Sequence, residues 1–358
     1  MTMASHNYSN GTLFGIRSDG ERYAYAGWYL LVIIASLLGD TTILISTIKY
    51  NAINLNKATV TFIQHIAVAD LGFATTYLLS MFVSTIARGQ VYGEVVCISI
   101  PYCGYYFVTS GALSISGMTL TKLLRLKFPL KSRTRWYGEH AQKICAGIWL
   151  SALYYPVALF IVDKSDVYFD YRLYNCMYGY TSPKWKWLQP IISIIIPVIP
   201  NLVIVSTTIL MLLEARKAVR LSHKHLRWQG ILTAMLTAIV FTLAFLPYAI
   251  YFISEQFVAK NPSSPVKDLF YSQFYRVSIA CTAINTMSNF FIYSLTVKSF
   301  RGFLCTRIYL VVSYFSTTTS QTGRPTQNIA DIPCEDVSPA VIFPIEINAA
   351  EVNGHAEE

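Results

Sequence analysis

Charged side chains are scarce in this chain, and the acidic ones are fewer than the basic ones. Only 13% of the 358 residues are Asp, Glu, Lys or Arg, whereas soluble domains carry about 25% charged residues. Hydrophobic residues make up 54% of the chain. This composition excludes an ordinary soluble domain and indicates an integral membrane protein.

Several chemical signatures are also missing from the sequence. The seven cysteines are too few and too scattered for a disulfide scaffold, and no Cys-x-x-Cys pair suggests a metal site. No pairing of a nucleophile with a base points to an enzyme. The first two dozen residues contain no apolar core of signal-peptide length.

The excess of basic residues could point to nucleic acid, but their positions decide against it. The net charge is +9, and the bases cluster in short segments between apolar runs. Cytoplasmic loops of membrane proteins show this pattern. The sequence therefore predicts a multi-pass protein of the plasma membrane with membrane lipid around it, no nucleic-acid partner, an extracellular N-terminus and a cytoplasmic C-terminus.

The most informative stretch runs from Cys97 to Leu130. It contains no charged residue between Cys97 and Thr121, and at about 1.5 Å per residue it can cross a hydrocarbon core of about 30 Å. One helical face carries mostly small residues, which let neighbouring helices approach closely in lipid. This face, Gly104, Val108, Gly111, Ser114 and Met118, indicates the central helix of a bundle rather than a lone anchor.

Seven apolar runs predict an all-α integral membrane protein built as a seven-helix bundle. The expected spans are 25–48, 58–86, a third beginning at 97, 141–162, 187–213, 231–253 and 271–295, followed by a short amphipathic cytoplasmic helix from 298. We divide the chain into an extracellular tail (1–24), a seven-transmembrane domain with the amphipathic helix (25–310) and a disordered cytoplasmic tail (311–358).

These spans carry a series of residues at the spacing of a known family. They are Asp70 in Ile66-Ala67-Val68-Ala69-Asp70, Cys97, Pro129-Leu130, Trp149, Cys176, Pro200, Pro247, Asn289, Tyr293 and Phe300. Over residues 25–310 the chain resembles the rhodopsin-like (class A) G-protein-coupled receptors.

The chain departs from the family pattern at four motifs, so we interpret it as a divergent, orphan-type member. Thr121-Lys122-Leu123 replaces Asp-Arg-Tyr, and Ala244-Phe245-Leu246-Pro247 replaces Cys-Trp-x-Pro. Phe290 follows Asn289 where the family has proline, and Gly39-Asp40 replaces Gly-Asn. These changes concern the switching behaviour rather than the fold.

The resemblance implies a receptor that transduces an extracellular ligand to heterotrimeric G proteins. Amine receptors of the family carry Asp where this chain has Gly104, and span seven has no Lys for a retinal Schiff base before Lys298. Uncharged aromatic walls suit a neutral small molecule, a lipid or a peptide side chain. The expected pocket is Gly104, Tyr105, Val108, Tyr248 and Tyr251, although such tyrosines can also simply lie at the membrane interface.

The resemblance also assigns residues to activation and coupling. The expected switch residues are Phe241, Phe245, Pro247 and Tyr293, and the G-protein contacts are Lys122 and Arg125. Lys122 lacks the planar fork of the family's arginine, and no acid occurs between Glu214 and Glu255. We therefore expect weak restraint of the inactive state and measurable basal signalling.

Two further implications concern a disulfide and a polar core. The resemblance implies a bond between Cys97 and Cys176, and a sodium pocket formed by Asp70, Asn285 and Asn289. Asp40 adds a second acid at similar depth, and two nearby carboxylates disfavour each other's ionisation. We expect one protonated acid or an unusually well bound cation; two separately hydrogen-bonded structural acids are the alternative. No other metal or cofactor is expected.

The sequence also predicts three kinds of modification. Sequons at Asn7 and Asn10 predict N-glycosylation, and Cys305 follows a basic amphipathic stretch, which favours palmitoylation. Phosphorylation of the cluster 316–320 would recruit arrestin, and an ordinary solvated tail is the alternative.

Two other functions compete with that of a receptor. A non-signalling or decoy heptahelical binding protein would explain the altered motifs. A transporter or channel is disfavoured because the sequence shows no internal repeat.

Overall fold

The computed structural model describes residues 19–51, 53–128, 136–154, 156–157, 167–170, 173–178, 188–220, 228–258 and 265–319. The helices are α1 (Asp19–Ile48), α2 (Lys57–Phe73), the π-helical turn η1 (Ala74–Leu78), α3 (Leu79–Ala87), α4 (Glu94–Lys127), α6 (Trp136–Ala152), α8 (Leu188–Arg220), α9 (Trp228–Val258), α10 (Pro265–Thr296) and α11 (Lys298–Thr319). Strands β1 (Val167–Asp170) and β2 (Asn175–Tyr178) form an antiparallel pair.

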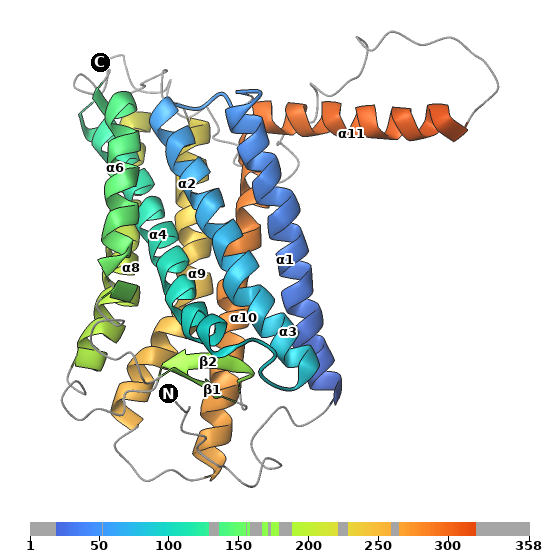
Figure 1. The fold of residues 1–358 in the computed structure, drawn as a ribbon. Helices are drawn as coiled ribbons and strands as arrows, with labels where there is room; N and C mark the ends of the chain where they lie inside the picture. Colours follow the sequence, from blue (N-terminus) through green and yellow to red (C-terminus); the bar gives the residue numbers. More distant parts are fainter. Residues whose placement is uncertain are drawn as a thin grey trace, which may run out of the picture.

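The long helices stand side by side as a bundle, and α11 leaves it almost at a right angle (Figure 1). The continuous segment α2–η1–α3 is one span, so α1, this segment, α4, α6, α8, α9 and α10 make the predicted seven-helix fold. Helix α4 contacts α2, α6, α8 and α9. This confirms the prediction of a central helix.

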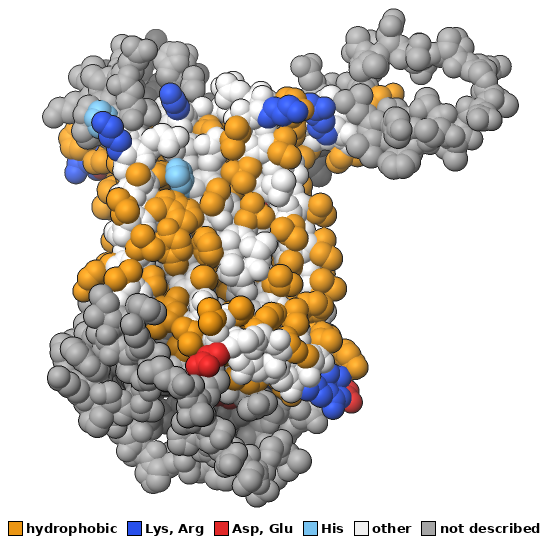
Figure 2. Space-filling view, viewed as in Figure 1, with side chains coloured by type: hydrophobic (Ala, Val, Ile, Leu, Met, Phe, Trp, Pro, Cys, Tyr) orange, Lys and Arg blue, Asp and Glu red, His pale blue; other side chains and the backbone are white. Residues whose placement is uncertain are grey.

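Five of the described helical segments are long and apolar enough to cross a membrane by themselves. They are Asp19–Ile48, Lys57–Ala87, Glu94–Lys127, Val198–Lys217 and Gln229–Tyr251. Figure 2 shows hydrophobic side chains around the waist of the visible face and charged ones at its two rims. The exposed apolar residues include Leu38, Leu150 and Leu243, as expected where lipid rather than water is the solvent.

Local sequence explains where several helices begin and end. Asn56 caps α2 because its side chain accepts a hydrogen bond from the Ala58 amide at 3.0 Å. Glu94 places a negative charge in the first turn of α4. Helix α3 ends at Arg88, which adopts a left-handed conformation with φ 60°.

The π-helical turn η1 interrupts the second span. Such turns accommodate one extra residue and shift the direction of the side chains that follow. Tyr77 and Leu78 are both buried there. The turn thereby directs Tyr77 toward the bundle interior, where it becomes part of the site described below.

The buried apolar residues form two clusters along the bundle. One cluster lies at the end of the bundle that carries the β-hairpin, which we call the outer end, and this outer cluster includes Tyr29, Tyr77, Cys97, Cys176 and Tyr275. The inner cluster includes Ile43, Phe62, Ile115, Phe241, Tyr293 and Phe300. The candidate site spans the boundary between them.

Some predicted boundaries need correction. Helix α1 begins at Asp19, six residues before the expected start at 25, and α11 continues to Thr319. The boundary drawn at 310 therefore falls inside a helix, and 311–319 are not a disordered tail. Asn7, Asn10 and residues 320–358 lie outside the described residues, as does the segment 158–166, into which the fourth span was expected to extend.

Candidate functional site

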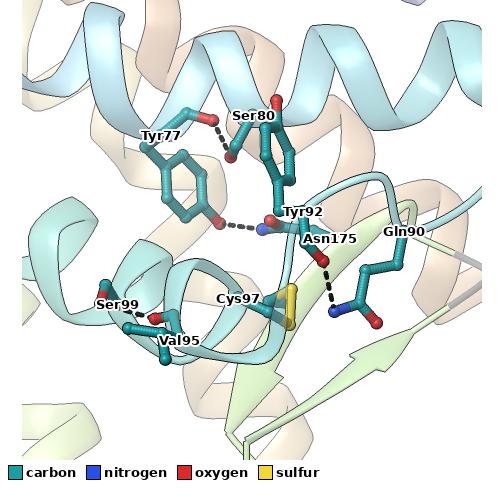
Figure 3. Close-up of a disulfide and its surroundings, with 9 residues drawn as sticks. Tyr77, Ser80, Gln90, Tyr92, Val95, Cys97, Ser99 and Asn175 are labelled. Carbon is teal, nitrogen blue, oxygen red and sulfur yellow. Dashed lines mark hydrogen bonds between the residues drawn. A yellow bond between two sulfur atoms is a disulfide. The ribbon is translucent and has the colours of Figure 1, made fainter.

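The β-hairpin is fixed to the outer end of α4 by a disulfide. Cys97 and Cys176 are bonded, with their Cα atoms 5.5 Å apart. The pairing implied by the family resemblance is thus confirmed. Figure 3 shows Asn175, beside the disulfide, directed at the ring of Tyr77. In the same view Gln90 donates to the carbonyl of Tyr92 at 3.0 Å, and partial burial raises the pKa of the Tyr92 phenol.

A hydrogen-bond network joins this hairpin to two spans. The side-chain amide of Asn175 donates to the Tyr77 hydroxyl at 2.8 Å, and the hydroxyls of Tyr77 and Tyr275 are 2.7 Å apart. Tyr275 also reaches the sulfur of Met177 at 3.3 Å. We call these four residues the roof network. It ties η1, α10 and β2 together, and buried polar groups that are all bonded in this way fix one arrangement.

Sequence reasoning did not identify the roof network. The position of Asn175 next to Cys176 was the one available signal, because a disulfide at the top of span three must bring the neighbouring residue close to the bundle. Tyr77 could not have been chosen, since its direction depends on the π-helical turn.

The predicted pocket residues lie below and beside the roof network. The Tyr248 hydroxyl donates to that of Tyr105 at 3.4 Å, across the gap between α9 and α4. The rings of Tyr251 and Tyr275 are edge-to-face with centroids 5.1 Å apart. Val108 packs against both apolar clusters.

Gly104 has a different environment from the other predicted pocket residues. It is buried, and a Cβ atom built there would lie 2.4 Å from the Tyr77 ring. The missing side chain therefore allows α4 and η1 to come together. Gly104 is a packing position, and the structure leaves no space there for a larger side chain.

The predicted switch residues form a stack along α9. Tyr248 packs on Phe245 with ring centroids 5.1 Å apart, and Phe245 stacks on Phe241 at 5.4 Å with nearly parallel planes. Pro247 lies within the helix between Phe245 and Tyr248. Because a proline removes one helical hydrogen bond, it marks the point where α9 can bend.

A small cavity lies against the lower end of this stack. Its volume is about 20 Å³, and one water molecule needs about 10–15 Å³ of such space. It can therefore hold a water or a small ion, but not a drug-sized ligand. Its lining includes Asp70, Val108, Phe241, Phe245, Asn285 and Thr286.

Both acids of the predicted polar core are buried and hydrogen-bonded. Asp70 accepts a bond from the Asn289 amide at 2.6 Å, and Asp40 accepts one from the Ser36 hydroxyl at 2.5 Å. The two carboxyl groups interact electrostatically. The structure therefore brings Asp40 close to Asp70, and the core holds two acids from neighbouring spans.

Several oxygen atoms in this core have no hydrogen-bond partner. They are Oδ1 of Asp40, Oδ1 of Asn285 and Oδ1 of Asn289, all buried. Buried polar atoms normally have partners, so each of these requires a water or an ion. Hard cations prefer oxygen ligands, and these residues fit the sodium ion that the family resemblance implies.

The unusual Phe290 is accommodated by a glycine on α1. A Cβ atom at Gly39 would lie 2.7 Å from Cβ of Phe290. The bare backbone lets α1 pack directly on α10 at this point, one residue before Asp40. The ring of Phe290 also contacts that of Phe300 edge-on at 6.0 Å.

At the inner end, Lys122 is 9% exposed and faces the start of α9. A Cβ atom built at Gly230 would lie 2.6 Å from its Nζ atom. Hydroxyl pairs join the helices here: Thr233 with Thr296 at 2.8 Å, and Thr207 with Thr119 at 3.0 Å. Arg125 is half-buried in the last turn of α4.

Ion pairs at the outer rim were not anticipated from the sequence. Arg276 is 1% exposed and approaches Glu21 at 3.6 Å, which joins α10 to α1. Asp19 of α1 pairs with Arg88 after α3. Arg22 donates to the carbonyl of Ile86 at 2.9 Å. The first turns of α1 thereby bind two other parts of the outer rim.

Cys305, the predicted palmitoylation site, lies in α11, and the modification stays a prediction.

The family model described as "7 transmembrane receptor (rhodopsin family)" matches residues 41–293. The chain belongs to this family of non-enzymatic receptors.

Curated relatives are distant. Human lysophosphatidic acid receptor 4 is 24% identical over 281 residues, covering 76% of this chain and 74% of that receptor. Human lysophosphatidic acid receptor 6 is 22% identical over 239 residues, covering 65% and 69%. The thyrotropin-releasing hormone receptor of Bos taurus is 24% identical over 308 residues, covering 76% and 75%.

Proposed function

We propose that this chain is a plasma-membrane receptor that passes the signal of an extracellular ligand to a heterotrimeric G protein. The N-terminus lies outside the cell and α11 lies in the cytoplasm. Family membership supports the class of function. The distribution of basic residues supports the orientation, because cytoplasmic loops carry the excess of Lys and Arg.

The mechanism rests on one observation: a continuous series of contacts runs from the Tyr105–Tyr248 pair to the polar core. Tyr105 contacts Tyr248, which packs on Phe245 and then on Phe241. Phe241 and Phe245 line the small cavity together with Asp70. A ligand that separates Tyr248 from Tyr105 would therefore disturb the stack at the Pro247 bend and the acid beneath it, which favours a different arrangement of α9.

The ligand we propose is a neutral small molecule or a peptide. Tyrosine hydroxyls and the Asn175 amide can pair with neutral polar groups. A monoamine is disfavoured because Gly104 supplies no carboxylate to pair with an amine, and a Cβ atom there would already lie 2.4 Å from the Tyr77 ring. Among the relatives, one name specifies a phospholipid and another a peptide hormone. The buried cation Arg276 approaches Glu21 at 3.6 Å, and the tyrosine hydroxyls and the Asn175 amide suit a neutral, amide-bearing ligand.

The polar core would bind sodium in the inactive arrangement. Asp70 supplies the charge, and the unpartnered oxygens of Asn285 and Asp40 supply further ligands. When bound, the ion would neutralise part of the charge of the two acids. Asp40 and Asp70 would then hold α1 and the second span against α10.

A G-protein dissociation assay in cells tests the function. The full chain is expressed with an extracellular tag, and panels of neutral small molecules and peptides are applied across G-protein subtypes. We expect at least one G-protein subtype to dissociate when a ligand is applied. The variant Tyr248→Ala should lose the ligand response while its surface expression stays unchanged.

The opposite result would favour another class. A chain that reaches the surface but never dissociates a G protein, with or without ligand, is the decoy or non-signalling protein. Glycosylation at Asn7 and Asn10, palmitoylation at Cys305 and arrestin recruitment stay predictions for separate measurement.

A further inference from the structure

Tyr50 is an exposed tyrosine on the segment that joins α1 to α2 at the inner end of the bundle. Its side chain is 40% exposed. Asn51, directly after it, adopts a left-handed conformation with φ 46°, so the chain turns at this point. A hydroxyl that accepts a phosphoryl group must line up with the γ-phosphate in the kinase. A tyrosine on a surface turn reaches such a position more readily than one within a helix.

The ring of Tyr50 lies among basic side chains. The guanidinium of Arg307 lies 4.3 Å from the ring centroid, and the ammonium of Lys49 lies 5.4 Å from it. Phe303 packs on the same ring, with the two centroids 5.4 Å apart. Arg307 and Phe303 belong to α11, so the segment between α1 and α2 meets this helix through Tyr50.

The hydroxyl of Tyr50 is not engaged in the same way as its ring. Among the described residues, the contacts of Tyr50 involve the ring, and its hydroxyl makes no hydrogen bond. The segment has a second attachment to α11, because the amide of Asn54 donates to the hydroxyl of Ser299 at 2.9 Å. A group transferred to the Tyr50 oxygen therefore displaces no hydrogen bond and leaves this attachment in place.

The sequence around this contact contains no acid. The segments 41–64 and 286–309 lack Asp and Glu and carry Lys49, Lys57, Lys298, Arg301 and Arg307. Figure 2 shows basic side chains gathered where α11 leaves the bundle in Figure 1. A phosphoryl group adds about −1.5 to −2 charge at neutral pH. Within these segments it would meet cations and no like charge, and pairs of arginine with phosphate are strong.

We propose that Tyr50 is a phosphorylation site for a cytosolic tyrosine kinase that uses MgATP. The phenolic oxygen forms a bond with the γ-phosphorus while the bond from that phosphorus to the β–γ bridging oxygen breaks. ADP leaves, and the phenolic proton passes to the catalytic base of the kinase. The phosphate on Tyr50 then pairs with Arg307 and Lys49 and ties the segment more firmly to α11. The site rests on the cytoplasmic position of α11 given under the proposed function.

Phosphorylation of the purified full-length chain in non-ionic detergent tests the site. A recombinant tyrosine-kinase catalytic domain and MgATP are added, and mass spectrometry follows the phosphate at each tyrosine. Tyr309 is the matched comparison, because it is 42% exposed but lies within α11. We expect phosphorylation to be about tenfold faster at Tyr50, since the helix must open locally before Tyr309 can enter the kinase.

The unfolding temperature tests the pairing of the phosphate with the two cations. Phosphorylation should raise it by about 2–4 °C, because new charge-assisted hydrogen bonds join two elements. Lys49→Gln/Arg307→Gln should lose this rise. The matched variant Lys143→Gln/Arg216→Gln removes two exposed inner-end bases from α6 and α8 and should keep it. The acidic residue p-carboxymethyl-phenylalanine at position 50 supplies the negative charge in every variant, so the comparison does not depend on the kinase.

Three results would overturn the proposal. They are a rate at Tyr50 no greater than that at Tyr309, an unfolding temperature that does not rise, and an equal rise in the two double variants. The assay needs no ligand and no G protein, so failure here leaves the receptor function untouched.

The orientation on which the site rests is tested separately. Cells that express the chain are treated with vanadate, which blocks tyrosine phosphatases, and phosphate is mapped at Tyr50 and at Tyr23. Tyr23 is 58% exposed and lies near the outer end of α1. Phosphate at Tyr50 without phosphate at Tyr23 supports the site, whereas phosphate at Tyr23 alone would refute the orientation and with it the proposed function.

Discussion

The outer and inner ends of the bundle are held together by different kinds of interaction. At the outer end a disulfide, the roof network and the ion pairs Arg276–Glu21 and Arg88–Asp19 join separate elements. At the inner end, the described contacts between helices include the hydroxyl pair Thr233–Thr296 and the approach of Lys122 to Gly230. Among the described residues, a disulfide and ion pairs join separate elements at the outer end, whereas hydroxyl pairs and helix packing join them at the inner end.

This difference teaches which end of the molecule can move. A neutral hydrogen bond contributes about 0.5–1.5 kcal/mol, whereas charged pairs and disulfides that are well buried contribute more. Helix α9 begins without an acid that could pair with Lys122, since none occurs between Glu214 and Glu255. A bend at Pro247 would therefore move the inner part of α9 while the roof network keeps its arrangement.

The largest effect should come from breaking the disulfide. Replacing Cys97 and Cys176 with Ser frees a loop of 79 residues, for which the chain-entropy model gives about 4 kcal/mol as an upper value. We expect most surface expression to be lost and the unfolding temperature of the remainder to fall. Cys103→Ser/Cys281→Ser, which changes two free and partly exposed thiols, is the control and should leave both quantities unchanged. Equal losses in the two double variants would contradict the assigned role.

Removing the Tyr77 hydroxyl should weaken the outer end without breaking it. Tyr77→Phe leaves the Asn175 amide without its buried acceptor and leaves the Tyr275 hydroxyl with only the weak acceptor sulfur of Met177, at a cost of about 1–3 kcal/mol. Thermal unfolding of the purified chain measures the loss. The control is Tyr29→Phe, because the buried Tyr29 hydroxyl makes no hydrogen bond and its removal should cost nothing. The network would be refuted by equal effects at the two positions.

Sodium sensitivity should depend on the polar core that lies between the two ends. At a sodium concentration tenfold above Kd, the ion would stabilise the chain by about 1.4 kcal/mol. In the wild type, replacing N-methylglucamine chloride with sodium chloride should raise the unfolding temperature. We expect Asp70→Asn to abolish this rise and Asp40→Asn to reduce it. Asp19→Asn at the outer rim serves as the control. If Asp40→Asn responds to sodium as the wild type does, Asp40 is not part of the site.

The smallest effect should come from adding a restraint to the inner end. Gly230→Asp places a carboxylate beside Lys122, and an ion pair of about 0.5–1 kcal/mol would lower basal G-protein activation roughly two- to fivefold. Gly230→Asn has the same shape without the charge and should leave basal activation unchanged. A similar fall in both variants would show that size, rather than charge, is responsible.

The fold, the Cys97–Cys176 bond and the proximity of Asp40 to Asp70 could be predicted from the sequence. Apolar runs and family spacing fix which helices exist and at what depth each residue lies. The direction of individual side chains could not be predicted, because it depends on local geometry. Tyr77 faces Tyr275 through a π-helical turn, and Gly104 packs against the Tyr77 ring. The pair Arg276–Glu21 depends on how far α1 extends above the membrane.

The most direct test measures distances at both ends of one molecule without ligand. Spin labels on non-canonical residues at positions 127 and 232 report the inner ends of α4 and α9, and labels at 95 and 253 report their outer ends. We predict a broad or multiple distance distribution for the inner pair and a single narrow one for the outer pair. Equally narrow distributions at both ends, or a broader one at the outer end, would contradict the account.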